Sequence, residues 1–162
     1  MNLVIRATTF ILLLFIISQN SKADFKVLSP SNPASLECGD LLARYGEKQP
    51  IFNFVDCSVG EGQVVLKATY KVRGEDSEVA EAFLVEKYGL GRLTFTCCGW
   101  EPKNGKAGQI KNSSLQQKHP NYTLSITMFA NAEQKRENGD AYLEKDRNKI
   151  AYFTVLVKVL NI

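Results

Sequence analysis

The stretch that decides the fold is residues 63–73, QVVLKATYKVR. Successive side chains of a β-strand point to opposite faces, so this stretch predicts one apolar face, made by Val64, Leu66, Ala68, Tyr70 and Val72. Residues 51–57, IFNFVDC, alternate in the same way, and a turn at residues 59–62, VGEG, separates the two runs. Two alternating runs joined by a glycine-containing turn predict a β-hairpin.

Two helices and three further strands are predicted around this hairpin. One helix is expected over residues 34–45, with Ser35 or Asn32 as its cap, and the other over residues 77–88, with Gly89 as its stop. The apolar stripe predicted for the second helix consists of Val79, Phe83 and Leu84. The remaining strands are predicted at residues 93–98, 122–130 and 150–160.

This order of elements is typical of an α+β fold, a curved antiparallel sheet of about five strands with two helices packed on one face. Cystatin-like and NTF2-like folds have a similar layout, but a shared layout says nothing about chemistry. Residues 99–121 are predicted to form a long polar loop, and residues 131–149 a hairpin connection between the last two strands. A loop longer than about 15 residues in a compact domain is usually functional or disordered.

Residues 1–23 have the pattern of a cleavable secretory signal. A short positive start ends at Arg6, the apolar run ATTFILLLFII follows at residues 7–17, and Ser21-Lys22-Ala23 has the small residues of a signal-peptidase site. The apolar run is shorter than the roughly 20 residues that a membrane span needs. We therefore expect residues 24–162 to be a single domain that is exported, either to the periplasm or as a secreted protein, without stable membrane insertion.

The charge of the chain argues against a nucleic-acid partner. The chain has 20 Lys and Arg against 17 Asp and Glu, and Arg6 and Lys22 lie in the predicted signal. The exported part is therefore close to neutral, whereas domains that bind nucleic acid are usually strongly basic.

All four cysteines, Cys38, Cys57, Cys97 and Cys98, follow the predicted signal. An even number in an exported chain predicts two disulfides, and four cysteines allow three pairings. The favoured pairing joins Cys97 to Cys98 and Cys38 to Cys57, while the two crossed pairings stay open. We expect these bonds to stabilise the fold, and a redox role for Cys97 and Cys98 is the alternative.

The sequence contains no recognisable catalytic or metal-binding set. The cysteine spacing lacks a C-x-x-C, and His119 is the only histidine, so neither a metal site nor a cofactor is predicted. Oxidised cysteines cannot act as nucleophiles, and His119, next to Pro120, is expected to be solvated. An enzyme is therefore not the favoured interpretation.

The candidate partner-binding residues lie in the predicted loop. Trp100, the only tryptophan, opens the loop, and exposed polar residues are expected to follow it. A lone tryptophan often packs against a core, but tryptophan is also enriched among binding hot spots. The hypothesis is a binding surface made by Trp100, Lys103, Lys106 and Lys111.

Residues 88–91, YGLG, followed by residues 95–102, FTCCGWEP, resemble a family of small exported bacterial proteins of unknown function. The resemblance rests on this stretch together with the signal and the chain length. It implies a periplasmic location and no known activity, so it transfers no functional residues.

These observations favour an exported binding or inhibitor-type protein with a protein partner, such as an immunity protein against a delivered toxin. One alternative is a small-ligand-binding module with a pocket between sheet and helices. Another is a thiol-redox protein that uses Cys97 and Cys98. The sequence predicts no oligomeric state.

Overall fold

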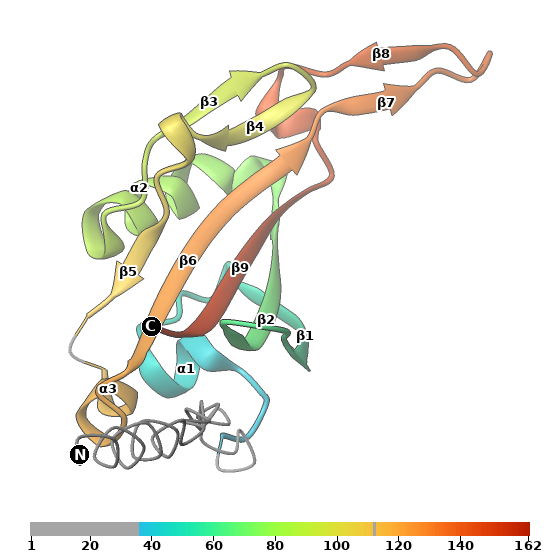
Figure 1. Cartoon of the computed structure of the whole chain (residues 1–162). Coiled ribbons are helices and arrows are strands. Elements are labelled where there is room, and N and C mark those ends of the chain that lie inside the picture. Colours follow the sequence, from blue (N-terminus) through green and yellow to red (C-terminus); the bar gives the residue numbers. More distant parts are fainter. Residues whose placement is uncertain (1–35, 112) are drawn as a thin grey trace, which may run out of the picture. The chain divides into compact units, whose positions relative to one another are not determined.

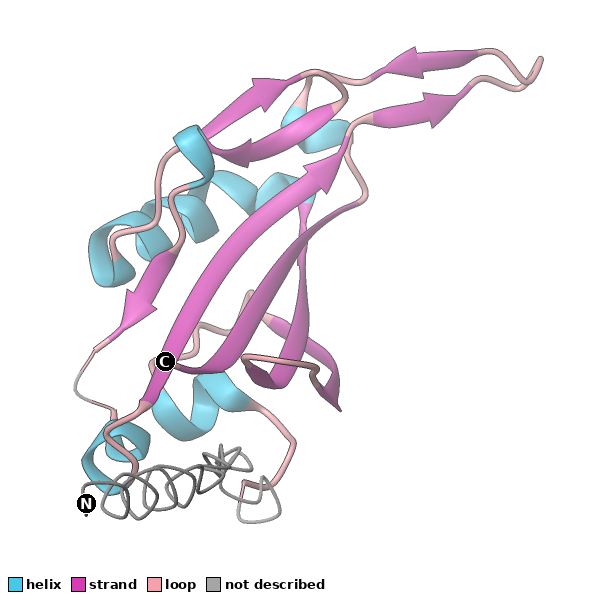
Figure 2. Ribbon diagram, viewed as in Figure 1, coloured by secondary structure: helices cyan, strands magenta, loops and turns pink. Residues whose placement is uncertain are grey.

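The computed structural model describes residues 36–111 and 113–162, which belong to one compact unit, Pro33–Ile162. The predicted signal, residues 1–23, lies outside the described residues. The unit is an α+β fold with a mostly antiparallel sheet, as predicted (Figure 2). No helix in the described part of the chain is long and apolar enough to cross a membrane.

The helices and strands follow one another along the chain as Figure 1 labels them. The helices are α1 (Leu41–Tyr45), α2 (Ser77–Tyr88) and α3 (Ser114–Lys118), with 3-10 turns η2 (Gly74–Asp76), η3 (Lys103–Gly105) and η4 (Arg147–Lys149). The strands are β1 (Asn53–Val59), β2 (Val64–Arg73), β3 (Leu93–Thr96), β4 (Gly99–Pro102), β5 (Gly108–Ile110), β6 (Tyr122–Asn131), β7 (Glu133–Lys135), β8 (Ala141–Leu143) and β9 (Tyr152–Asn161).

The main sheet has seven strands in the order β1-β2-β9-β6-β4-β3, and β5 also pairs with β6. The strands β4 and β5 share one edge of β6, β4 near Ala130 and β5 near Ile126. Figure 1 shows that β6 and β9 are long and curved. The register of β1 and of β2 shifts once each, at Val55 and at Val65. Such bulges bend and twist a strand, so they contribute to the curvature of the sheet.

One face of the three long strands carries the hydrophobic core. The predicted apolar face of β2 is confirmed from Leu66 to Val72, where every second residue is at most 1% exposed. The strands β6 and β9 contribute side chains of the same face, which are 0% exposed: Leu124, Ile126, Met128, Phe153, Val155, Val157 and Val159.

Helix α2 has the predicted bounds but presents a different stripe to the core. Gly89 follows it in a left-handed conformation with φ 71°, which a glycine adopts without steric cost. Val79, predicted to be buried, is 64% exposed. The prediction is confirmed for Leu84, and Phe83 is partly buried against the core. The full buried stripe is made by Ser77, Ala80, Glu81, Leu84 and Tyr88. The helical period places Val79 on the side opposite to this stripe, and the prediction failed because it excluded a glutamate from the core.

Helix α1 is shorter than predicted, and Cys38 precedes it. Asp40 is the cap, because its side chain accepts a hydrogen bond from the Ala43 N–H at 3.1 Å. A side-chain acceptor at this position satisfies backbone donors that would otherwise lack a partner. The described residues before Asp40 are not helical, and Cys38 among them is bonded to Cys57 of β1.

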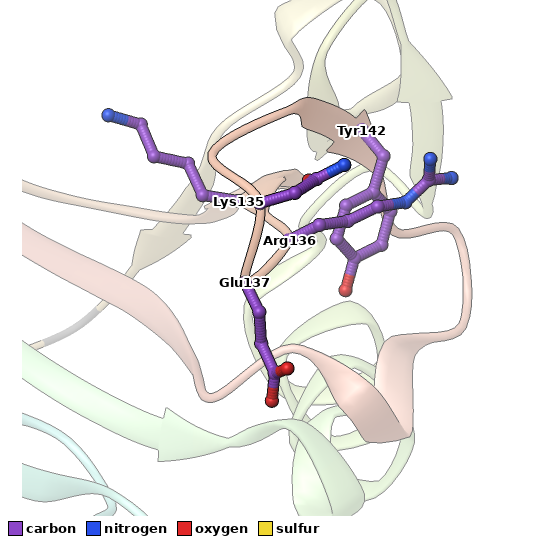
Figure 3. Close-up of a pocket in the computed structure, with 5 residues that line it drawn as sticks. Lys135, Arg136, Glu137 and Tyr142 are labelled. Atoms are coloured by element: carbon purple, nitrogen blue, oxygen red, sulfur yellow. The ribbon is translucent and has the colours of Figure 1, made fainter.

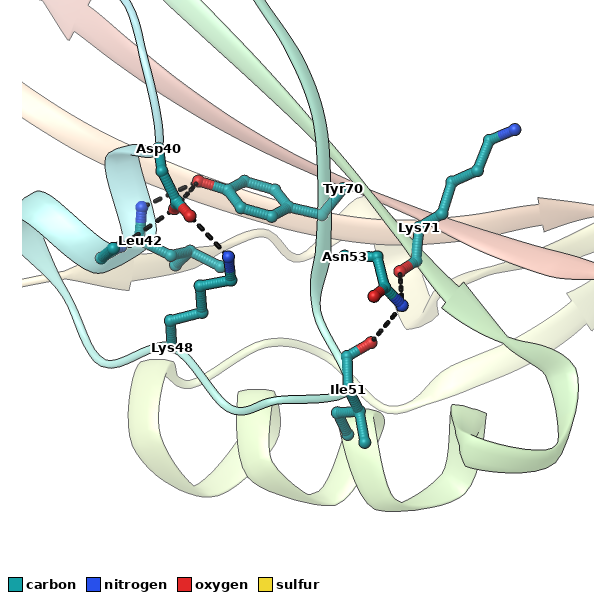
Figure 4. Close-up of polar contacts among 8 residues, drawn as sticks. Asp40, Leu42, Lys48, Ile51, Asn53, Tyr70 and Lys71 are labelled. Carbon is teal, nitrogen blue, oxygen red and sulfur yellow. Dashed lines mark hydrogen bonds and ion pairs between the residues drawn. The ribbon is translucent and has the colours of Figure 1, made fainter.

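Tyr70 connects β2 to the start of α1 (Figure 4). Its hydroxyl accepts from the Leu42 N–H at 2.9 Å and donates to Asp40 Oδ1 at 2.9 Å, and Lys48 donates to Asp40 Oδ2 at 2.5 Å. Burial raises the pKa of Asp40, but the hydrogen bonds from Lys48, the Ala43 N–H and Tyr70 outweigh burial, so that its pKa lies below the ordinary value. Burial raises the pKa of Tyr70, so its hydroxyl remains a donor.

The prediction of a long loop at residues 99–121 was wrong, because this segment contains β4, η3, β5 and α3. The two strands are only four and three residues long, so they are too short to show an alternating pattern in the sequence. Close packing requires a glycine in β4, since a Cβ on Gly99 would lie 2.2 Å from the carbonyl oxygen of Ala130. The predicted hairpin within residues 131–149 is confirmed as β7–β8.

The disulfides have the favoured pairing, Cys38 with Cys57 and Cys97 with Cys98. The first bond joins the segment before α1 to β1 across a sequence separation of 19 residues. The second bond joins neighbours in the turn between β3 and β4. The two bonds therefore constrain the unfolded chain to very different extents.

We expect the double replacement Cys38→Ser and Cys57→Ser to lower the free energy of unfolding by about 3 kcal/mol, since it removes a cross-link that closes a long loop. The double replacement Cys97→Ser and Cys98→Ser serves as the matched control and should cost about 1 kcal/mol, because that loop is minimal. Denaturant unfolding of the oxidised proteins measures both. Equal losses would contradict this assignment of the stabilising cross-link.

Candidate protein-binding surface

The turn between β3 and β4 consists of Cys97 and Cys98, because Thr96 pairs with Gly99. Both cysteines are exposed, and Cys97 has a φ of 50°. This left-handed conformation is uncommon for a residue other than glycine, and the bond between the two cysteines holds the turn in one shape. The carbonyl oxygen of Cys98 accepts a hydrogen bond from the N–H of Ala132 at 2.8 Å. The turn thus supports the segment that leads into β7.

Trp100 packs inward from β4. Its ring meets Phe95 of β3 edge to face, with 5.7 Å between ring centroids, and the guanidinium of Arg147 lies 5.1 Å from its centroid. The ring is half-buried against the core, and its Nε1 is buried without a hydrogen-bond partner among the described residues. These contacts favour a packing role for Trp100, and its role in partner binding stays a prediction.

Arg147 and Glu81 form the most buried ion pair of the described residues. Arg147 Nη1 lies 2.6 Å from Glu81 Oε2, and the two side chains are 12% and 9% exposed. The guanidinium also donates to the Oγ and to the carbonyl oxygen of Ser77, each at 3.1 Å. The other carboxylate oxygen of Glu81 accepts from the Leu93 N–H at 2.7 Å. This network joins α2, η4 and β3.

The sequence analysis missed this network. Glu81 lies four residues after Ser77, on the same side of α2 as Leu84 and Tyr88. A glutamate within such a stripe can be seen in the sequence and indicates a buried carboxylate that needs a partner. Its partner was not detectable, since Arg147 lies 66 residues further along the chain. The residues that interact with Arg147 come together only in the folded chain.

Lys103, Lys106 and Lys111 are exposed, and their role in partner binding stays a prediction. The first is part of η3, the second ends that turn, and the third follows β5. No described interaction joins any of the three to Trp100. The lysines lie beyond the Pro102 end of β4, whereas the Cys97–Cys98 turn lies before its Gly99 end.

The hairpin β7–β8 extends away from the main sheet (Figure 1). It forms a separate two-stranded sheet in which Lys135 pairs with Ala141. At its base, Ala132 is 0% exposed and its carbonyl oxygen accepts from the Glu144 N–H at 2.8 Å. The hairpin is therefore anchored at one end and free at the other.

The tip of this hairpin has its own local order. The N–H of Arg136 donates to the carbonyl oxygen of Asp140 at 2.9 Å, and Gly139 turns the chain with a φ of 90°. The Asn138 amide donates to Asp140 Oδ2 at 2.7 Å. The guanidinium of Arg136 lies 5.4 Å from the centroid of the Tyr142 ring, a cation–π contact. These contacts hold the tip without help from the core.

Around the Arg136–Tyr142 contact, the tip carries a shallow, open hollow of about 600 Å³ (Figure 3). Its lining includes both positive charge and a carboxylate, and the hollow is open to solvent. The lining residues are Lys135, Arg136, Glu137, Asn138 and Tyr142. Arginine and tyrosine are two of the residue types enriched in binding hot spots.

Residues 28–100 match a family described as a domain of unknown function (DUF4952). The match includes β1, β2, α2 and the Cys97–Cys98 turn, and it ends at Trp100. This match agrees with the expected resemblance to an uncharacterised family. The bacterial origin and the export of that family stay predictions. No curated protein and no solved structure matches the chain.

The replacement Glu81→Ala should lower the free energy of unfolding by about 3–5 kcal/mol, because it leaves the Arg147 guanidinium buried without its carboxylate. The Leu93 N–H would lose its acceptor as well. Denaturant unfolding measures the loss. Glu78→Ala, at an exposed position of the same helix, is the control and should change stability by less than about 0.5 kcal/mol. Similar values for the two variants would rule out a stabilising role for the network.

The replacement Trp100→Ala should lower the free energy of unfolding by about 2 kcal/mol or more, since it empties the space between Phe95 and Arg147. Trp100→Phe keeps an aromatic ring there and should cost less. Thermal melts of both variants measure the effect. If Trp100→Ala leaves the melting temperature unchanged, the tryptophan is not a packing residue, and the binding hypothesis for it becomes the better explanation.

Proposed function

We propose that this chain is an exported protein-binding module of the inhibitor or immunity type, which contacts its partner through the β7–β8 hairpin. The observation that carries the proposal is the hairpin itself, anchored at Ala132 and free at Arg136 and Tyr142. An isolated two-stranded hairpin contributes little to stability. A contact with a partner explains why the chain orders such a segment away from its core.

The surface chemistry of the hairpin supports a protein partner. Lys135, Arg136 and Glu137 place both signs of charge in the hollow beside the ring of Tyr142, and Leu143 is 44% exposed. Aromatic and arginine side chains with a charged rim are typical of protein interfaces. The tip is held by its own hydrogen bonds, which reduces the entropy lost on binding.

Export is part of the proposal. Residues 1–23 have the pattern of a secretory signal, and two disulfides are compatible with an oxidising compartment. We propose the periplasm or the extracellular space as the location, and a delivered toxin or an exogenous enzyme as the kind of partner.

A thiol-redox function is the second candidate, and one observation favours it. Cys97 and Cys98 are bonded to each other and are both exposed, so an external dithiol could reach either sulfur. The bond would then be exchanged for that of the dithiol, which becomes oxidised while Cys97 and Cys98 take up two electrons and two protons. Oxidation of an added dithiol by the protein, with two alkylatable thiols appearing at Cys97 and Cys98, would favour this candidate, and no such exchange would exclude it.

We expect the chain to lose affinity for its partner when the β7–β8 hairpin is shortened. Residues 136–140 are replaced by Asn-Gly, which closes a two-residue turn between the paired Lys135 and Ala141. The tagged full chain is used to capture partners from an exported fraction, and the purified partner is then titrated by calorimetry. The affinity should fall about tenfold or more, the scale of a hot spot, with a melting temperature within about 2 °C of the wild type.

The matched control for this experiment is Lys118→Ala, at an exposed position of α3 that does not belong to the hairpin. It should bind as the wild type does. A shortened hairpin that keeps full affinity would exclude the hairpin as the contact, and failure of the wild type to retain any purified partner would exclude the proposed function.

A further inference from the structure

The main sheet has a second face, opposite to the core. Residues of β2, β6 and β9 that alternate with the core residues lie on this outer face, and most are half-buried because neighbouring strands flank them. Figure 4 shows the side chains of Tyr70 and Lys71 pointing to opposite sides of β2. Tyr70 points toward α1, and Lys71 points to the outer face.

Two lysines lie directly opposite each other at the centre of the outer face. Lys67 of β2 and Lys158 of β9 are register partners on adjacent strands. Side chains in such positions have Cβ atoms about 5 Å apart, and like charges there are destabilising. Both lysines are half-buried, so water screens them less than it screens fully exposed lysines.

No described carboxylate forms an ion pair with either lysine. The next residues along this row are Ser58, which pairs with Lys67, and Ser125, which pairs with Lys158. Asp56 lies one row away on β1, opposite Thr69, and is exposed. The strand register therefore places two positive charges side by side, and within the described residues neither has a carboxylate as an ion-pair partner.

The rest of the outer face carries mainly apolar and hydroxyl side chains, together with Lys71, whose ammonium lies 5.1 Å from the centroid of the Tyr152 ring. Leu156 lies two residues from Lys158, about 7 Å along β9, between Thr69 and Thr127. Further along, Phe129 and Tyr152 are 38% and 50% exposed. Large aromatic side chains are enriched in protein interfaces.

We propose that the outer face binds an acidic segment of a protein, with carboxylates at Lys67 and Lys158 and an apolar side chain over Leu156. Two carboxylates complement the two ammonium groups and remove the repulsion between them. A polyanion such as nucleic acid is disfavoured because the whole chain has a net charge of only +3. This surface lies on the main sheet, so the inference does not rest on the β7–β8 hairpin or on its partner.

The probe is a dye-labelled synthetic decapeptide that repeats Glu-Leu-Glu, titrated into the full chain and followed by fluorescence anisotropy. Replacing Lys67 and Lys158 together by threonine should weaken binding about tenfold or more. The same peptide with glutamine in place of glutamate should bind the wild type about tenfold more weakly or worse. The melting temperature of the double variant should stay unchanged or rise, because a repulsive pair is lost and threonine favours strands.

The matched control replaces the exposed Lys118 and Lys149 by threonine, which removes the same charge from another part of the chain. Its affinity for the peptide should stay within about twofold of the wild type. Three results would overturn the inference: equal loss in the control, full binding by the Lys67 and Lys158 variant, and tighter binding of a single-stranded DNA oligonucleotide at the same lysines. If the double variant unfolds, the two single variants Lys67→Thr and Lys158→Arg are titrated with the peptide instead. Lys67→Thr should weaken binding because it removes a charge, and Lys158→Arg should not because it keeps one.

This experiment and the hairpin experiment can fail separately. The variant with the shortened hairpin should still bind the acidic peptide, since the outer face of its main sheet is intact. The lysine variant should still bind the hairpin's partner through the tip. Loss of peptide binding in the shortened hairpin would overturn the assignment of the peptide to the outer face.

Discussion

The structure depends above all on the ion pair between Glu81 and Arg147. Glu81 holds the backbone of β3 through the Leu93 N–H, and Arg147 holds the start of α2 through Ser77. The guanidinium also lies close to the rings of Trp100 in β4 and Phe153 in β9. This one cation therefore contacts helix α2, the β3–β4 hairpin and the central strand β9. A buried charge without its partner is costly. The hairpin β3–β4, which forms the edge of the sheet, is therefore fixed to α2 through this pair.

That edge in turn positions the candidate binding element. Cys98 accepts a hydrogen bond from the residue that precedes β7, and the Cys97–Cys98 bond limits the shapes that the turn can adopt. The hairpin β7–β8 continues from this point, so its direction depends on a turn that is itself held to the core through Phe95 and Trp100. A binding element on a rigid support loses less entropy when a partner binds.

The two faces of the sheet serve different purposes. The core face is apolar and covered by α1 and α2, and the Tyr70 hydroxyl on it has both a donor and an acceptor partner. The outer face has lysines in register without described carboxylate partners. Folding alone does not require that arrangement, because threonine or serine at these positions would pair across the strands without repulsion. Arrangements that lower stability and are not needed for folding are commonly found at functional sites.

The sequence by itself determined the α+β class, the bounds of α2 and the long strands β2, β6 and β9, because each depends on local period. It favoured the cysteine pairing that the structure has but left the two crossed pairings open, because Cys38 and Cys57 lie 19 residues apart. Only the tertiary structure decided the strands within residues 99–121, which are too short to show a period. It also decided that α2 buries Glu81 and exposes Val79, because the partner of Glu81 lies 66 residues away. The register that puts Lys67 beside Lys158 depends on strands far apart in the chain, and alternation within one strand cannot specify a neighbour.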